Sequence, residues 1–141
     1  MELLVAMGIV MILYSIGILA FGSLQKESSL DLVSSQIKTT IYKAQAQTIN
    51  GIDSGVYFDQ GRYVFFEGPE FVEGKSQNWE ENLPESLQII SINLPSQQVL
   101  FSKISGYVNN YVSPMDLTLL EPSTGKTRII SINKLGVVEI Q

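Results

Sequence analysis

The first residue of this chain that could do chemistry is Glu2, a carboxylate at the N-terminal edge of an apolar run over residues 3–24. The next charged residue is Lys26. A carboxylate beside such a run is costly to bury unless a partner meets it. Two interpretations stay open. Glu2 is a solvated acid favoured by the dipole at the start of a helix, or it is a functional residue whose charge a partner meets.

A second group of acids lies between residues 67 and 85, where Lys75 is the one basic residue. Carboxylates there could bind calcium, but the spacing of an EF-hand loop is missing, so we favour a solvated acidic surface loop. Sequence spacing does not place two of these acids across a sugar as glycoside hydrolysis requires. We expect no metal and no cofactor. The acids are Glu67, Glu70, Glu73, Glu80, Glu81 and Glu85.

The composition offers little catalytic chemistry. The chain has no histidine and no cysteine, and it contains no nucleophile-elbow, phosphate-loop or dinucleotide glycine motif. Disulfides and thiolate metal sites are thereby excluded. With nine basic and fourteen acidic residues and a net charge of -5, the chain does not suit a nucleic-acid surface. We expect a protein that is not an enzyme and has no catalytic residues.

The apolar run has the length of a membrane-crossing helix. Residues 3–24 would span about 33 Å as a helix, against roughly 30 Å for the hydrocarbon layer of a bilayer. A cleaved signal peptide is the alternative, but no basic residue precedes the run. We therefore expect a retained single-pass membrane anchor over residues 1–24.

An amphipathic pattern continues directly from the run. Apolar or small residues recur at steps of three and four across residues 25–50, with charged residues off this stripe. The sequence predicts one helix from about Glu2 to Ile49, ended by Asn50 and Gly51, because glycine readily adopts the left-handed capping conformation. The stripe is Leu30, Val33, Ile37, Ile41, Ala44 and Thr48.

Residues 51–141 show the alternation of strands. A hairpin is predicted around the turn 59–62, and short turns containing proline or glycine separate the later strands. The predicted fold class is α+β, with a long N-terminal helix, transmembrane in its first half and amphipathic in its second, packed on an antiparallel β-sheet domain. The predicted strands are 56–58, 63–67, 87–93, 98–104, 115–121, 127–133 and 137–140.

Aromatic residues of the hairpin and of the acidic loop could contact a partner. For the hairpin we favour core packing, with residues of one parity facing inward. Trp79 is a lone tryptophan in the acidic loop. Two interpretations of it stay open: an exposed interaction residue and an anchor that holds the loop. The hairpin aromatics are Tyr57, Phe58, Tyr63, Phe65 and Phe66.

The string Glu2-Leu3-Leu4-Val5-Ala6-Met7-Gly8-Ile9-Val10 resembles the N-terminal signature of type IV pilins and type II secretion pseudopilins. In that signature a leader ending in glycine precedes a mature Phe-Thr-Leu-Ile-Glu-Leu-Leu-Val sequence, so Glu2 matches the glutamate of the family. The remainder loosely resembles the minor pseudopilins of the H type and related minor pilins, including the closing segments 128–133 and 136–140.

The resemblance implies a minor pseudopilin or pilin-like structural subunit of a type II secretion pseudopilus or a type IV pilus. Protein export or pilus biogenesis would be its role. Glu2 would pair with the N-terminal amine of a neighbouring subunit, while Gly8 and Gly17 would allow close helix packing. The residues expected in assembly or interaction are Glu2, Leu3, Leu4, Val5, Gly8, Gly17 and Trp79.

The partners implied are other pilin or pseudopilin subunits, the bacterial inner membrane with its assembly platform, and a prepilin peptidase if a leader is encoded upstream. The globular domain would lie in the periplasm or outside the cell. The absence of cysteine favours a minor over a major subunit, and the Val-Val-Glu-Ile-Gln end argues against DNA binding. The alternative function is a single-pass, membrane-anchored binding or sensor domain that does not polymerise.

Overall fold

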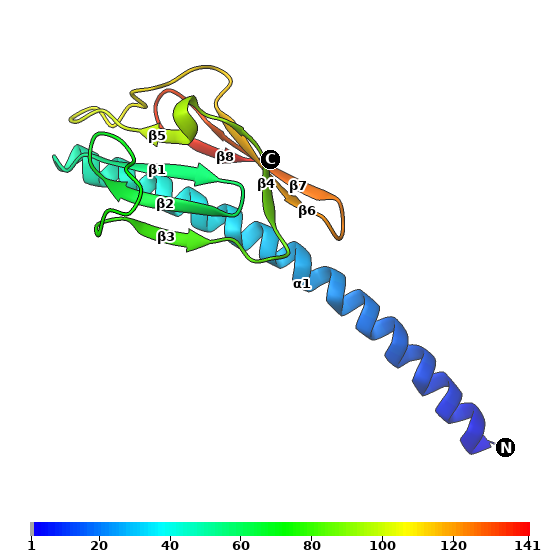
Figure 1. Ribbon diagram of the computed structural model, residues 1–141. Helices are drawn as coiled ribbons and strands as arrows, with labels where there is room; N and C mark the ends of the chain where they lie inside the picture. Colours follow the sequence, from blue (N-terminus) through cyan, green and yellow to red (C-terminus); the bar gives the residue numbers. More distant parts are fainter. Residues whose placement is uncertain (1) are drawn as a thin grey trace.

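The computed structural model consists of one long helix and a β-rich domain that packs along the C-terminal part of that helix (Figure 1). The structure describes the backbone of residues 2–141 and the side chains of residues 7, 8, 10–12, 14, 15 and 29–141. The N-terminal part of the helix extends away from the domain. The molecule thus has a globular head, which comprises residues 30–141, and a helical arm, which is the part of α1 before residue 30.

Helix α1 runs over Glu2–Ile49 and ends in a hydrogen-bonded glycine cap. Gly51 has a φ of 96°, its N–H donates to the carbonyl of Thr48 at 3.0 Å, and Ile52 N–H donates to the carbonyl of Gln47 at 3.1 Å. This is a Schellman motif, which uses the conformational freedom of glycine to satisfy the last carbonyls. The predicted glycine cap is confirmed.

The strands form two antiparallel four-stranded sheets. Sheet 1 has the order β3-β2-β1-β5 and sheet 2 the order β4-β6-β7-β8. The bounds are β1 (Ser54–Asp59), β2 (Arg62–Glu67), β3 (Trp79–Asn82), β4 (Gln88–Asn93), β5 (Gln98–Leu100), β6 (Asp116–Glu121), β7 (Lys126–Ile132) and β8 (Val138–Ile140), with a 3-10 turn at Pro95–Gln97.

The predicted stripe of α1 is the face that packs on the sheets. All of its members are buried in the core, together with inward-facing residues of both sheets. Burial of such side chains is the main favourable contribution to folding, worth about 1.5–3 kcal/mol for each large aliphatic residue. The sheets of the head therefore pack against α1 from residue 30 onward. The stripe is Leu30, Val33, Ile37, Ile41, Ala44 and Thr48.

Sheet 1 is covered on its second face by the loop that follows β2. Phe71 of this loop stacks on Tyr57 with ring centroids 4.1 Å apart, and its ring meets Phe66 at 5.7 Å. Val64 and Phe66 are consequently buried, as are Tyr63 and Phe65 on the helix side. One face of the hairpin lies in the main core as predicted, through Val56, Phe58, Tyr63 and Phe65. The sequence did not predict the small second core that the loop forms on the other face.

The predicted fold class is wrong on its membrane-crossing helix. Among the described residues, no helical segment combines the length and the apolar character that a membrane crossing requires. The prediction rested on the length of the run 3–24, most of whose side chains lie outside the described residues. The strands are divided between two sheets, so that β4 and β5, which are neighbours in the sequence, belong to different sheets.

Candidate assembly site

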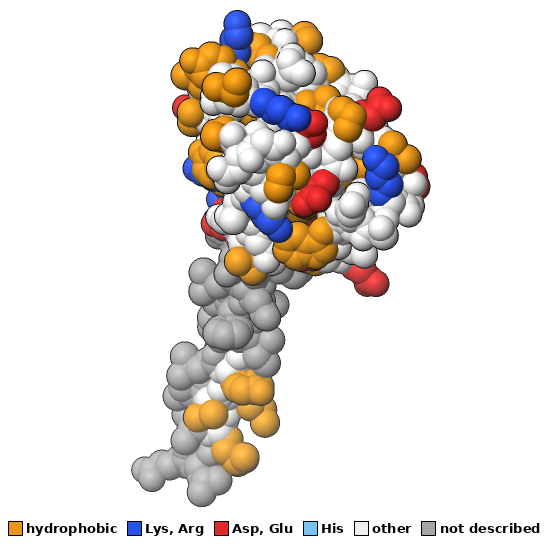
Figure 2. Space-filling view, turned by 90° about the vertical axis from the view of Figure 1, so that its left-hand side faces the viewer, with side chains coloured by type: hydrophobic (Ala, Val, Ile, Leu, Met, Phe, Trp, Pro, Cys, Tyr) orange, Lys and Arg blue, Asp and Glu red, His pale blue; other side chains and the backbone are white. Residues whose placement is uncertain are grey.

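The arm of α1 exposes large apolar side chains outside the head. Met7, Val10, Met11, Ile12 and Tyr14 have exposed fractions between 54% and 71%. Figure 2 shows these side chains as orange groups on the described part of the arm, well separated from the head. Contiguous exposed apolar surface on a protein usually marks an interaction site. In the described part of the arm, this surface is the clearest candidate for one.

Of the residues predicted for assembly, Glu2, Leu3, Leu4, Val5 and Gly17 lie outside the described side chains. Gly8 is described, and no atom lies within 4 Å of the position that a Cβ would occupy there. The surface of the helix at Gly8 is therefore open to close approach by a second helix.

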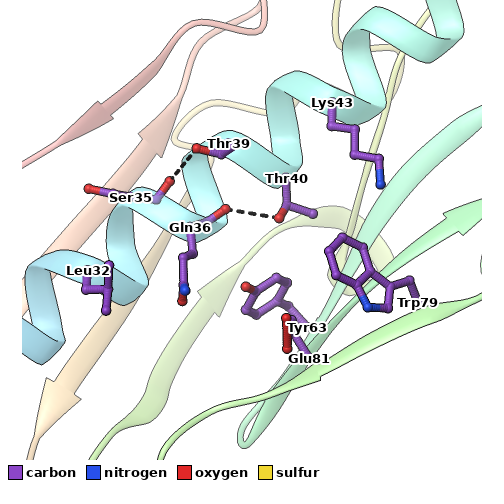
Figure 3. A pocket seen from close by; sticks show the side chains of 9 residues that line it. All are labelled: Leu32, Ser35, Gln36, Thr39, Thr40, Lys43, Tyr63, Trp79 and Glu81. Atoms are coloured by element: carbon purple, nitrogen blue, oxygen red, sulfur yellow. Dashed lines mark hydrogen bonds between the residues drawn. The ribbon is translucent and has the colours of Figure 1, made fainter.

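Trp79, the remaining predicted residue, opens β3 and lines a groove between α1 and sheet 1. The groove has a volume of about 570 Å³ and is mostly apolar. One wall is the helix and the other is formed by the edge of the sheet, and Figure 3 shows the side chains of the two walls facing each other. The groove is lined by Leu32, Ser35, Gln36, Thr39, Thr40, Lys43, Tyr63, Trp79 and Glu81.

A cation lies between two aromatic rings at one end of the groove. The ammonium nitrogen of Lys43 is 4.5 Å from the ring centroid of Trp79 and 4.6 Å from that of Phe65. Attraction between an ammonium group and the faces of aromatic rings holds both side chains in place. Trp79 is nevertheless 52% exposed. It thus both anchors β3 to the helix and presents an aromatic edge to solvent.

Tyr63 forms part of the sheet wall, and its ring is buried. Burial raises the pKa of its phenol above the usual value, and the negative charge of Glu81 raises it further, while a hydrogen bond with Thr40 opposes these effects. Thr40 in turn donates to the carbonyl of Gln36 at 3.0 Å. At neutral pH the groove wall therefore carries an uncharged phenol beside a carboxylate.

Arg62 forms ion pairs with two carboxylates of the acidic segment, Glu73 and Glu80. The Arg62 guanidinium donates to Glu80 at 2.8 Å and to Glu73 at 3.0 Å, and it lies 3.8 Å from Asp59. Its hydrogen bond to Glu73 is the main cause that raises the pKa of Arg62. Among the described residues, no cluster of three acids, histidines or cysteines has the arrangement of a metal site.

The prediction of one long surface loop over residues 67–85 missed β3. This strand carries the sequence Trp-Glu-Glu-Asn, and all four residues are exposed. Its pairing with β2 matches Phe65 to Trp79 and Val64 to Glu80. Because the strand has no apolar alternation, the two-residue period that indicates a strand is absent.

The structure also brings out Gln45, which the sequence analysis did not single out. Its amide nitrogen donates to the carbonyl of Gly106 at 2.8 Å and to that of Leu135 at 3.0 Å. One helix side chain thereby fixes two loops at the far end of the head. A glutamine next to an amphipathic stripe gives no sequence signal for such a role.

Comparisons of this chain with protein-family models, with curated protein sequences and with solved structures gave no match.

Proposed function

We propose that this protein is a pilin-like structural subunit that assembles with copies of itself or with sister subunits through its N-terminal helix. The particular role that we favour is that of a minor pseudopilin or minor pilin, acting in protein export or pilus biogenesis. Its partners would be other such subunits and the assembly platform at the bacterial inner membrane, with the head in the periplasm or outside the cell.

One observation carries the proposal. From Leu30 onward α1 is packed against the sheets, while its N-terminal part extends away from them (Figure 1), and the apolar side chains described there are exposed. Packing such helices side by side removes that surface from water. The open helix surface at Gly8 allows the backbones to approach closely. Glu2, by the resemblance to pilins, would be neutralised by the amino terminus of a neighbour.

Crosslinking through single cysteines tests the proposal, because the chain contains no cysteine of its own. Val10→Cys in the full-length protein should give disulfide-linked dimers under oxidising conditions, and links to a sister subunit that carries a cysteine at the corresponding position of its helix. Ile90→Cys, on an exposed apolar position of β4, is the matched control and should stay unlinked. A Val10→Cys protein that stays monomeric would contradict assembly and favour the binding or sensor domain that does not polymerise.

A further inference from the structure

The outer edge of β3 is a free strand edge. β3 is the terminal strand of sheet 1, with β2 as its neighbour. Leu83 N–H donates to the carbonyl of Gly61 at 2.8 Å, and the hydrogen bonds of an antiparallel pair recur at every second residue. The main-chain N–H and C=O groups of Glu80 and Asn82 therefore point away from β2. Among the described residues, no other hydrogen bond reaches these groups.

The other terminal strands have protected edges. On β5, the side chain of Asn110 accepts from Leu100 N–H at 3.2 Å and donates to the carbonyl of Gln98 at 2.8 Å. On β8, Val138 N–H donates to the hydroxyl of Tyr42 at 3.3 Å, and a shift in register interrupts the pairing of β4 with β6. Such features keep an exposed edge from pairing with another chain. β3 has a continuous register with β2 and, in the described part of the chain, no side chain that caps its outer edge.

The groove between α1 and sheet 1 runs beside this free edge and has the length of a strand. Toward Ser29 and Pro84 it continues into a second cavity of about 220 Å³. Together the two cavities follow α1 from Ser29 to Lys43, about 21 Å along its axis, which is the length of about six residues of extended chain. Figure 3 shows Trp79 and Glu81 of β3 on the side that faces the helix. Alternate side chains of a strand paired with β3 would therefore point into the groove.

Glu81 is the charge of the groove that has no counter-charge. The ammonium group of Lys43 lies between two aromatic rings at one end. Glu80 points to the opposite face of the sheet, where it pairs with Arg62 at 2.8 Å. No ion pair within the described residues involves Glu81. A residue directly opposite Glu81 on an added strand would lie on the same face, about 5 Å away between Cβ atoms, so a basic residue there is favoured.

The same charges disfavour a second copy of this chain as the added strand. β3 carries two adjacent glutamates in the sequence Trp-Glu-Glu-Asn. If β3 paired with β3 of another copy, every register that overlaps three or more residues would place a glutamate opposite a glutamate. Like charges directly opposite each other destabilise a strand pair. The strand that fits this edge therefore comes from a different protein.

We propose that the free edge of β3 binds an extended segment of another protein, which adds a fifth strand to sheet 1. The segment carries Lys or Arg opposite Glu81 and apolar residues two positions to either side, opposite Trp79 and Leu83. Hydrogen bonds to the main chain of Glu80 and Asn82 supply affinity, and the side chains that enter the groove supply specificity. This site goes beyond the proposed function, because it does not involve the helical arm.

Two synthetic peptides test this site on the full-length protein in detergent. One is Thr-Val-Thr-Lys-Thr-Val-Thr with blocked ends, and the other has Glu in place of its Lys. Trp79 is the single tryptophan and lines the groove, so its fluorescence reports binding. The Lys peptide should shift the emission to shorter wavelength and bind on the order of tenfold more tightly than the Glu peptide. Equal affinities, or no shift with either peptide at millimolar concentration, would overturn the proposal.

Reversing the charge at residue 81 locates the contact. Glu81→Lys should invert the preference, so that the Glu peptide binds more tightly than the Lys peptide. Glu70→Lys makes the same change at an exposed acid outside β3 and should keep the preference of the wild type. The same change of preference in both variants would mean that only the net charge of the protein matters, and the site at β3 would be wrong.

A proline at the free edge tests the added strand itself. Asn82→Pro removes an N–H that points away from β2, so it should leave the midpoint of urea unfolding nearly unchanged and abolish binding of the Lys peptide. Asn82→Ala keeps this N–H and should bind as the wild type does. Undiminished binding by a folded Asn82→Pro protein would exclude strand addition, and if this variant does not fold, the charge reversal at residue 81 decides.

A second copy in the groove would have its own signature. The emission of Trp79 would then shift to shorter wavelength as the protein concentration rises without peptide, and a different protein would be excluded as the natural occupant. Crosslinking at Val10→Cys reports on the helical arm alone. Its result therefore stands or falls separately from binding at β3.

Discussion

Gly55 lies directly opposite Phe66 on the neighbouring strand, and the aromatic ring of Phe66 occupies the space that a side chain at residue 55 would need. A Cβ at residue 55 would be 2.6 Å from the ring and 2.7 Å from the carbonyl oxygen of Val99. Because Phe66 also contacts Phe71, this glycine permits the second core of sheet 1. The relationship shows how a backbone position determines the packing of the loop that follows β2.

Gly55→Ala should destabilise the head by about 1–3 kcal/mol, since an added methyl group in a packed region forces neighbouring atoms to move. Urea unfolding followed by the fluorescence of Trp79, the single tryptophan, measures this free energy. Gly61→Ala is the matched control because no atom lies within 4 Å of its Cβ position. Equal stability of the two variants would show that β1 has room to adjust.

Gln45→Glu should destabilise the head by about 2 kcal/mol or more. It removes two hydrogen bonds worth about 1 kcal/mol each and places a carboxylate beside the carbonyl oxygens of Gly106 and Leu135. The free energy of unfolding is again the measurement. Gln77→Glu makes the same chemical change at an exposed position and should shift stability by less than about 0.5 kcal/mol.

The buried phenol of Tyr63 predicts a loss of stability at alkaline pH. Its pKa in the folded protein is raised above 10.0, so the folded state holds the phenolic proton more tightly than the unfolded state. The resulting stability is present below pH 10 and is lost as the pH rises through the folded-state pKa. Unfolding free energies of the wild type should therefore fall more steeply above pH 10 than those of Tyr63→Phe.

Tyr107→Phe provides the comparison for this pH dependence, because Tyr107 is about half exposed. Its alkaline profile should follow that of the wild type. If Tyr63→Phe also follows the wild type, the alkaline loss comes from other groups and the phenol at residue 63 contributes nothing to it.

The sequence predicts the parts of this fold that depend on local periodicity. The buried stripe from Leu30 to Thr48 follows from the sequence, because apolar residues on one face of an amphipathic helix recur every 3.6 residues. The glycine cap at Gly51 and the turn between β1 and β2 were readable from residue type alone. These features involve residues close together in the chain.

The parts that the sequence did not predict depend on tertiary contacts. Lys43 and Trp79 are far apart in the sequence, so no local pattern predicts that they meet. The predicted strand 98–104 ends at Leu100, because the chain turns into the loop in which Ile104 has a positive φ. The division of the strands between two sheets likewise depends on pairing partners, which short turns between strands do not specify.

The contact between Lys43 and Trp79 predicts how the groove responds to substitution. Trp79→Ala should remove the ring over the Lys43 ammonium and destabilise the head by about 0.5–1 kcal/mol from this attraction. The loss should be larger in total, because β3 also loses its contact with the helix. Since the variant has no tryptophan, circular dichroism replaces fluorescence as the measurement. Trp79→Phe should recover part of the lost stability, whereas full stability of Trp79→Ala would show that Phe65 alone holds Lys43.

Glu2→Leu tests the role that the resemblance to pilins implies for the first acid. If the carboxylate neutralises an amino terminus of a neighbouring subunit, its removal leaves that ammonium unpaired in an apolar contact, at a cost of about 3–5 kcal/mol. Incorporation into assemblies, measured by crosslinking at Val10→Cys in the same chain, should fall sharply while the head stays folded. Glu70→Leu, at an exposed acid of the head, should leave incorporation unchanged. Because helices that associate only through apolar packing would gain from an added leucine, undiminished or improved incorporation of Glu2→Leu would separate the two explanations and remove Glu2 from assembly.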